Sequence, residues 1–237
     1  AKALAEANVV LYDALSNDEL LSYAPKKALK IFVGKRKGSH AYTQDEINQL
    51  IVDNALTYGH VVRLKGGDPF IFGRGSEEIE FVESFGIPTF VVPGISSSIA
   101  VPASQGISLT KRGVSESFWV ITGTTSARKL STDVALAAQS TATVVILMGM
   151  SKLDEIVALF QNESKGEMPV AIIQNGTTPE EKTGMGTIDT IQKIVADKNL
   201  SSPAIIVIGE VVGDSKRRVC FYKELKSNQK VLAYGKE

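Results

Sequence analysis

The chain reads VVRLKGGDPFIFGRG over residues 61–75, and this stretch decides the fold. It begins as an apolar run of strand type, which requires burial, and continues into a loop with four glycines. A loop this rich in glycine serves positive φ angles or a close approach of backbone to another group. Asp68 lies where the strand ends, the edge at which open α/β sheets bind ligands. A turn capped by Asp68 is the alternative interpretation.

Strands and helices are expected to alternate on both sides of this loop. In the first half, short apolar runs predict strands at 9–12, 30–33, 60–64 and 89–92. Thr43 and Glu46 have the spacing of a capping box, Gly59 ends the helix that follows, and acidic residues open another helix at residue 76. Near-continuous apolar strands between helices predict an α/β fold with a largely parallel sheet covered on both faces.

A second series of the same kind follows a polar segment without periodicity at 109–117. Strands are expected at 118–121, 144–147, 170–173 and 204–208, and helices at 131–139, 153–160 and 187–195. We interpret the polar segment as a linker between two α/β domains, residues 1–113 and 114–237.

Composition excludes several classes of function. The 237 residues are 43% hydrophobic and 22% charged with a net charge of zero, so nothing indicates a nucleic-acid or membrane partner. No apolar run approaches the roughly 18–20 residues that a membrane span needs. Cys220 is the only cysteine, which suits a reducing cytoplasm, and with two histidines it cannot build a usual zinc site, so no metal is expected.

Ordered motifs from about Ala3 to Gly213 extend the pattern of the glycine loop. They read NVVLYD at 8–13, VGKRKGSH at 33–40, QDEIN at 44–48, VPGISS at 92–97, LMG at 147–149, NGT at 175–177 and IGEVV at 208–212. Together with 61–75, they resemble the uroporphyrinogen-III C-methyltransferases of the tetrapyrrole methylase family. The resemblance implies two αβα domains of the tetrapyrrole methylase type with the active site in the cleft between them.

The resemblance also implies a reaction. Methyl groups of S-adenosyl-L-methionine would be transferred to two ring carbons of uroporphyrinogen III, giving precorrin-2 for sirohaem or cobalamin biosynthesis and leaving S-adenosyl-L-homocysteine. It further implies a cytoplasmic homodimer.

Two residues are implied as catalytic. Asp13 ends one strand and Lys35 ends the next, so both are expected at the same edge of the sheet. In the family these positions serve as proton acceptor and proton donor for the macrocycle. A structural ion pair between Asp13 and Lys35 is the alternative.

The implied cofactor site is composite. Glycine backbone would approach the methionine and ribose parts, Asp68 would accept hydrogen bonds, and Ile71 would form an apolar wall. The residues implied are Gly66, Gly67, Asp68, Ile71, Ser96, Ser97, Met148 and Gly176. On its own Met148 would be interpreted as a core residue. A glycine loop with an aspartate also suits a dinucleotide in principle, but the Gly-x-Gly-x-x-Gly helix opening is absent.

A substrate with eight carboxylates needs local positive charge on a neutral chain. We expect it at Arg36, His40, Lys65 and Arg74, which cluster near the ends of predicted strands. A solvated surface charge is the alternative for each of them.

Two rival functions stay open: another tetrapyrrole methylase, such as a later precorrin methylase, and a non-catalytic protein that binds an adenosyl ligand. Family members have a first strand and a Gly-x-Gly-Pro-Gly-Asp loop before the helix that leads into residues 8–13. The printed sequence begins inside that helix, at Ala1. A polypeptide without that loop is expected to bind its ligands poorly.

Overall fold

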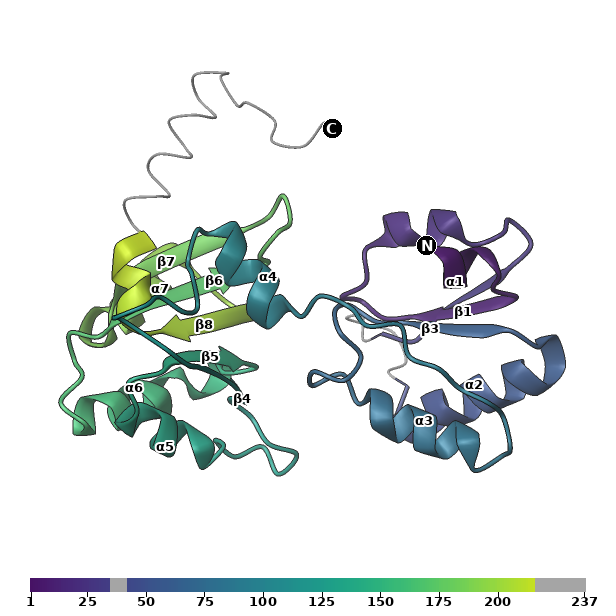
Figure 1. Ribbon diagram of the computed structural model, residues 1–237, viewed down its shortest axis with the longest axis horizontal. Helices are drawn as coiled ribbons and strands as arrows, with labels where there is room; N and C mark the ends of the chain where they lie inside the picture. The colour runs from purple at the N-terminus through teal and green to yellow at the C-terminus, as the bar shows by residue number, and fades with distance from the viewer. Residues whose placement is uncertain (35–41, 216–237) are drawn as a thin grey trace, which may run out of the picture. The chain divides into compact units, whose positions relative to one another are not determined.

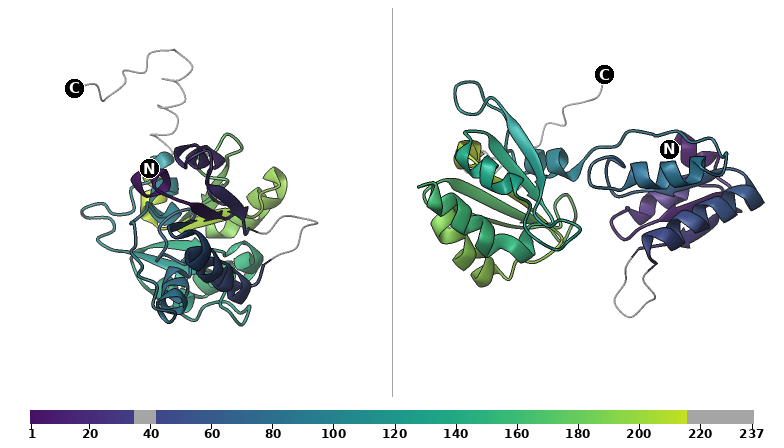
Figure 2. Two further views of the ribbon diagram at one scale, coloured as in Figure 1. Left: turned by 90° about the vertical axis from the view of Figure 1, so that its right-hand side faces the viewer. Right: turned by 90° about the horizontal axis from the view of Figure 1, so that it is seen from below.

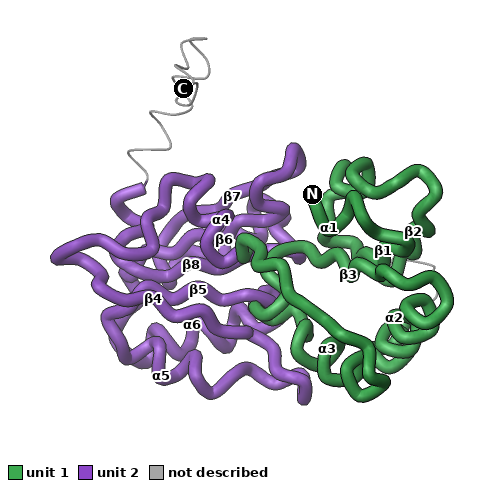
Figure 3. Tube along the Cα trace, turned by 45° about the vertical axis from the view of Figure 1, so that its right-hand side comes forward, with its two compact units in different colours: residues 1–96 green, residues 97–237 purple. Residues whose placement is uncertain are grey.

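The computed structural model describes residues 1–34 and 42–215. The chain forms two compact units, Ala1–Ser96 and Ser97–Glu237 (Figure 3). The sequence predicts a later division, after Gly113. The structure assigns 97–113 to the second unit because Val101 and Ile107 are buried in the same apolar cluster as Val145 and Val207.

Unit 1 contains a three-stranded parallel sheet in the order β2-β1-β3 (Figure 1). Val9 of β1 pairs with Leu29 of β2 on one side and with Val61 of β3 on the other. Along the chain, the elements are α1 (Lys2–Ala5), β1 (Val9–Tyr12), the 3-10 helix η1 (Asp18–Tyr23), β2 (Leu29–Phe32), α2 (Gln44–Tyr58), β3 (Val61–Leu64) and α3 (Gly75–Glu83).

Helices cover both faces of the unit 1 sheet. Val9 and Leu11 pack against α2 and α3, whereas Val10 packs on the opposite face with Leu4 and Ala24, from α1 and the end of η1. The predicted capping box at the start of α2 is confirmed: Glu46 N donates to Thr43 Oγ1 at 3.2 Å, and Thr43 N donates to Glu46 Oε2 at 2.7 Å.

The strand predicted at 89–92 is wrong. This segment is not hydrogen-bonded into the described sheet, and Phe90 and Val92 expose 73% and 58% of their surface. An apolar run forms a strand only where a partner edge and a covering layer are available to it, and no strand among the described residues pairs with this segment.

Unit 2 contains a five-stranded sheet in the order β4-β5-β8-β6-β7 (Figure 1). Its elements are α4 (Ser97–Ser104), β4 (Phe118–Thr122), α5 (Asp133–Gln139), β5 (Thr143–Leu147), the 3-10 helix η2 (Met150–Lys152), α6 (Leu153–Asn162), β6 (Pro169–Gln174), β7 (Lys182–Thr187), α7 (Ile188–Lys198) and β8 (Ala204–Ile208).

The second sheet is mixed, not largely parallel. β4 and β5 pair in parallel, whereas β8 runs antiparallel to both β5 and β6, and β6 runs antiparallel to β7. The α/β class is confirmed in both units, but the predominance of parallel pairing holds for unit 1 alone. Short apolar runs fix strand positions, whereas direction depends on partners that the pattern does not contain.

β7 was not predicted, because it reads KTGMGT and glycine is depleted in strands. The glycines are explained by α7. A Cβ on Gly186 would lie 2.5 Å from Ile194 Cδ1, and a Cβ on Gly184 would lie 2.8 Å from Leu200 Cδ1. The two glycines therefore let α7 and the turn after it pack closely on the edge strand.

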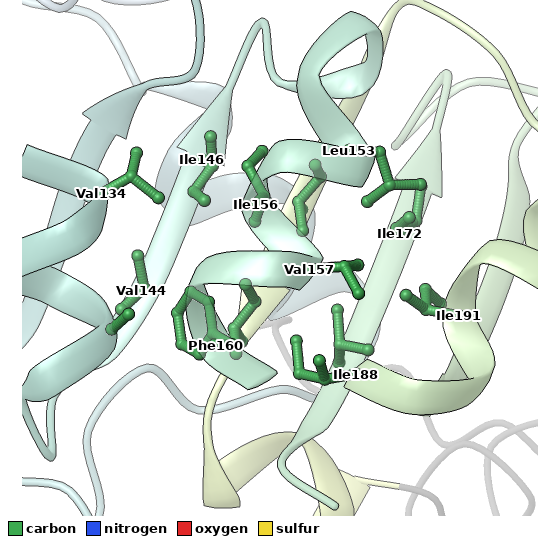
Figure 4. Close-up of a cluster of buried hydrophobic side chains, with 14 of the residues drawn as sticks. Val134, Val144, Ile146, Leu153, Ile156, Val157, Phe160, Ile172, Ile188 and Ile191 are labelled. Carbon is green, nitrogen blue, oxygen red and sulfur yellow. The ribbon is translucent and has the colours of Figure 1, made fainter. Parts of the chain in front are cut away.

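The core of unit 2 is apolar on both faces of its sheet. On one face, Ile156, Val157 and Phe160 of α6 lie against Ile146 of β5 and Ile172 of β6 (Figure 4). The helices α5, α6 and α7 share this face, and α4 lies on the other (Figure 2). Full burial of each such side chain contributes about 1.5–3 kcal/mol, so this core stabilises the sheet from which the unit 2 loops extend.

Candidate active site

Asp68 shapes the glycine loop that follows β3. Its Oδ1 accepts a hydrogen bond from Phe70 N at 2.9 Å, and its Oδ2 accepts one from Gly94 N at 3.0 Å. These amides, first that of Gly94 and then that of Phe70, hold the pKa of Asp68 below its ordinary value of 3.8. The ionised carboxylate therefore ties the loop after β3 to the Pro93–Gly94 turn.

Two glycines are required in this loop for different reasons. A Cβ on Gly66 would lie 2.5 Å from the Leu15 carbonyl oxygen, so Gly66 permits the turn after β1 to approach. Gly67 has a φ of 129°, which side chains rarely adopt, and its nearest obstacle to a Cβ is Ile95 O at 3.7 Å. The backbone at Gly67 is thus open to close approach by another group.

The same loop exposes apolar side chains and contains backbone strain. Phe70, Ile71 and Phe72 are all exposed, although large apolar side chains favour burial. Phe72 and Arg74 have φ angles of 52° and 58°, which are unfavourable for residues with large side chains. Strained backbone beside an exposed apolar surface is typical of a loop shaped to bind a ligand.

Asp13 follows β1 and is held from two directions. Its Oδ1 accepts hydrogen bonds from Leu15 N at 3.0 Å and from Ser16 Oγ at 3.2 Å, and its Oδ2 pairs with Arg63 Nη2 at 3.4 Å. About a quarter of the side chain, 24%, is exposed. The carboxylate is therefore fixed in orientation and still open to solvent on one side.

Lys65 is turned toward a buried carboxylate. Its Nζ donates to both carboxylate oxygens of Glu78 at 3.0 Å, and its side chain is 11% exposed. Burial, and next the charge of Arg63, lower the pKa of Lys65 below its ordinary value of 10.5. The sequence predicts a substrate contact for Lys65, but the described structure gives its charge an internal partner.

Arg74 is more accessible than Lys65. It pairs with Glu77 through two guanidinium nitrogens, and both side chains are about half exposed. The hydrogen bond to Glu77 raises the pKa of Arg74. Because an exposed pair of this kind is weak, the guanidinium is free to exchange Glu77 for another carboxylate.

Three predicted site residues, Lys35, Arg36 and His40, lie outside the described residues. The predicted arrangement of Asp13 and Lys35 therefore stays a prediction, as does the alternative ion pair between them. Of the predicted serines, Ser96 is buried at the end of unit 1, and Ser97 begins α4 in unit 2.

Met148 and Gly176 follow two strands that end at the same edge of the unit 2 sheet. β5 and β6 both run antiparallel to β8, which lies between them, so their carboxyl ends point the same way. Met148 is exposed with a φ of 56°, and its carbonyl accepts a hydrogen bond from Thr124 Oγ1 at 2.8 Å. The structure thus presents Met148 outward at this edge, not in the core.

The loop around Gly176 is packed on α4. A Cβ on Gly176 would collide with the side chain of Val101, so no larger residue fits without movement. Its neighbours Asn175 and Thr177 have φ angles of 48° and 69°, and Thr177 N donates to Glu181 Oε2 at 2.8 Å. Left-handed backbone at a β-branched residue persists only where surrounding contacts impose it.

Sequence reasoning missed Arg63 and Glu78, which link Asp13 and Lys65 into one charge network. A signal was present, because Arg63 is a charged residue inside an apolar strand and therefore needs a buried partner. The partner could not be read from the sequence, since Glu78 lies on a helix and meets Arg63 only in the folded unit.

Two further findings concern the part of the chain that the structure describes. No group of three or more His, Cys, Asp or Glu side chains there could hold a metal ion. Across the same residues, every helix is too short or too polar to span a bilayer.

Comparison with known proteins shows the family to which this chain belongs. Residues 1–192 match the model for Tetrapyrrole (Corrin/Porphyrin) Methylases. The chain therefore belongs to the tetrapyrrole methylase family.

Several members are similar over most of this chain. A uroporphyrinogen-III C-methyltransferase of Methanocaldococcus jannaschii is 48% identical over 213 residues, which are 89% of this chain and 88% of the relative. A siroheme synthase of Actinobacillus pleuropneumoniae is 41% identical over 94% of this chain, which spans only 46% of that longer protein.

The fold has a solved counterpart as well. A uroporphyrin-III C-methyltransferase from Thermus thermophilus, solved in complex with S-adenosylhomocysteine, superposes with a TM-score of 0.74 at 32% identity, covering 89% of each chain.

Proposed function

We propose that this chain is an S-adenosylmethionine-dependent uroporphyrinogen-III C-methyltransferase that methylates two ring carbons and yields precorrin-2. One observation carries the proposal: the 48% identical relative of that name matches over nearly the full length of both chains. Fold similarity alone would not separate this reaction from others in the family, because one fold supports many activities.

The glycine loop and the unit 2 edge have features that fit an adenosyl cofactor. The backbone at Gly67 is open to close approach, Ile71 and Met148 expose apolar surface, and Asp68 keeps the loop in one shape. When bound, S-adenosylmethionine supplies an electrophilic methyl group on a sulfonium. We assign cofactor binding to Gly66, Gly67, Asp68, Ile71, Ser96, Ser97, Met148 and Gly176.

The role of Asp68 is refined by its contacts. Both carboxylate oxygens already accept hydrogen bonds from backbone amides, one each. Each oxygen has a second lone pair, so Asp68 can also accept from a ligand hydroxyl. Its first contribution, however, is to fix the loop.

Proton movements on the macrocycle are assigned to Asp13 as acceptor and Lys35 as donor. Methyl transfer from a sulfonium needs alignment more than acid catalysis, so both groups act on the pyrrole substrate. The hydrogen bonds from Leu15 and Ser16 and the pair with Arg63 keep the Asp13 carboxylate in one orientation.

Binding of the polyanionic substrate is assigned to Arg36, His40, Lys65 and Arg74. Among the described residues of this set, Arg74 has the stronger case because its guanidinium is exposed, while Lys65 is committed to Glu78. A bidentate guanidinium matches a propionate or acetate carboxylate well.

The test is methyl transfer to freshly reduced uroporphyrinogen III. We expect two S-adenosylhomocysteine molecules per tetrapyrrole and a mass gain of two methyl groups in the product. Binding of S-adenosylmethionine without turnover would instead indicate a ligand-binding protein. Turnover restricted to an already methylated precorrin would indicate a later methylase.

We further propose a cytoplasmic homodimer that binds neither nucleic acid nor membrane. The zero net charge supports the absence of a nucleic-acid or membrane partner, the single cysteine suits a reducing cytoplasm, and the dimer is what the family resemblance implies. Sedimentation equilibrium should give twice the chain mass of 25.4 kDa, and a monomer mass would contradict it.

A further inference from the structure

Glu78 is a buried carboxylate at the centre of the unit 1 charge network. Its side chain is 6% exposed, and it lies in the first turn of α3. Its Oε1 accepts from Arg63 Nε at 3.3 Å, from Lys65 Nζ at 3.0 Å and from Gln44 Nε2 at 3.1 Å. Its Oε2 accepts from Lys65 Nζ at 3.0 Å. Donors from β3 and α2 thus converge on one acid.

Arg63 connects Glu78 with Asp13. The Nη1 atom of Arg63 donates to the Leu64 carbonyl at 2.7 Å, its Nε donates to Glu78, and its Nη2 faces Asp13 Oδ2 at 3.4 Å. The planar guanidinium is therefore fixed at two points, and the third nitrogen is aimed at Asp13. A guanidinium held in this way orients its carboxylate partner as well as attracting it.

Charge balance gives Glu78 a second effect on Asp13. Two cations, Arg63 and Lys65, share two carboxylates, Glu78 and Asp13. Both carboxylates favour the charged form of Lys65, so Asp13 already lies within its field. Without the Glu78 charge, both partly buried cations would turn to Asp13, because an uncompensated buried charge is costly.

A need for stability alone does not account for this network. Replacing a buried ion cluster by apolar side chains of similar volume is often neutral or stabilising, so a gain in stability is a weak explanation of this network. The network also reaches Asp13, the carboxylate that the proposed function makes the proton acceptor.

We propose that Glu78 is a positioning residue for methyl transfer, acting through Arg63 to hold Asp13 in its reactive orientation. The proposal rests on the role of Asp13 in the proposed function. Lys65 has a supporting part, as the second cation that holds the Glu78 carboxylate in place.

The first test does not depend on activity. In the full chain with 15N-labelled arginine, Arg63 Nε–H should give a slowly exchanging NMR signal, assigned by its loss in Arg63→Lys. The signal should persist in Glu80→Gln, a control at an exposed position of α3. It should broaden or vanish in Glu78→Gln and in Glu78→Met. An unchanged signal in both variants would overturn the proposal.

The second test is a double-mutant cycle on kcat. Glu78→Gln should lower kcat by up to about 100-fold with little change in the affinity for S-adenosylmethionine, as expected of a misplaced catalytic group. In an Asp13→Ala background the same change should lower kcat less than twofold, because Asp13 is no longer there to orient. Equal effects in both backgrounds would show a merely structural role and refute the proposal.

The two proposals fail separately. A parent protein that binds S-adenosylmethionine but methylates no tetrapyrrole contradicts the proposed function, while the Arg63 signal still decides whether Glu78 positions this network. A parent that turns over normally with Glu78→Gln unimpaired retains its function and removes Glu78 from it.

Discussion

Both sheets of this protein bury apolar side chains, but among the described residues only the unit 1 sheet also carries a partly buried network of charged groups. In unit 2, Val145, Ile146, Ile172 and Val207 are completely buried among other apolar groups. In unit 1, β3 is only half-buried along its length, and its Arg63 joins Asp13 and Glu78 in a charge network. The difference fits the proposed division of tasks, in which unit 2 contributes backbone loops on an apolar core and unit 1 contributes the charged side chains.

Both units nevertheless strain the backbone where strands end. Left-handed φ angles occur at Phe72 and Arg74 after β3, at Met148 after β5, and at Thr177 after β6. A scaffold tolerates such residues only if its packing is stronger than the strain, which is about 1–3 kcal/mol at each position. Apolar clusters on both faces of each sheet supply this packing, and the cluster around α6 in unit 2 contains the most buried residues.

The largest effect on kcat with the least effect on stability is expected for a substitution at Asp13. Asp13→Asn keeps the shape of the side chain and removes its capacity to take a proton at neutral pH. We expect kcat to fall about 100- to 10,000-fold, with little change in the urea midpoint of unfolding. Steady-state kinetics and urea unfolding measure the two effects. Asp18→Asn, at an exposed aspartate of η1, is the control and should keep parental kinetics.

The opposite result is expected in the core of unit 2. Phe160 is 2% exposed, so Phe160→Ala should lower the free energy of unfolding by about 3–5 kcal/mol. The folded fraction should retain its kcat, because Phe160 is a residue of α6 that packs among Ile and Val side chains of the core and belongs to none of the candidate site loops. Leu136→Ala removes an exposed side chain of α5 and should cost much less. A fall in kcat per folded molecule would break the proposed separation.

Gly176 tests whether unit 2 contributes through backbone shape. The methyl group of Gly176→Ala would collide with Val101, and overpacking of this kind costs about 1–3 kcal/mol. We expect weaker binding of S-adenosylhomocysteine in calorimetric titration. The double variant Gly176→Ala/Val101→Ala removes the obstruction and should recover part of the affinity. Unchanged affinity in the single variant would remove this loop from the cofactor site.

The smallest effect is expected for Asp68 and depends on pH. Because its folded-state pKa lies below the unfolded value, Asp68 stabilises the fold fully above the unfolded value and loses that contribution as the pH falls through the folded one. In Asp68→Asn, the loss of stability between about pH 5 and about pH 3 should therefore be smaller than in the parent. Urea unfolding at both pH values measures it, and parallel pH curves would contradict this assignment.

Local signals predicted much of the fold. The strands at 9–12 and 204–208 lie where the apolar runs placed them, and Thr43 caps α2 as its spacing indicates. The sequence does not predict β7, because its two glycines reflect packing against α7 and the turn after it, a contact that lies outside the strand. The run at 89–92 has strand composition but no strand partner among the described residues. Pairing is a tertiary property that composition does not contain.

Most residues of the candidate site were proposed from family motifs, and only some of them from the physical chemistry of the sequence. Asp68 and Gly67 could be singled out because a strand followed by glycines restricts backbone geometry. The internal pairing of Lys65 could not, since its partner Glu78 lies 13 residues further along the chain and on a helix. The roles of Lys35, Arg36 and His40 stay predictions.

Thr177 also has a consequence for protein engineering. A β-branched residue at a φ of 69° is a natural target for stabilisation, since Gly or Asn would adopt this backbone at lower energy. A library selected for heat resistance alone would therefore favour exchange at this position. If that strain holds the neighbouring Gly176 in its useful shape, the selected variants would be more durable and slower enzymes. Directed evolution of this chain should therefore select for heat resistance and turnover together.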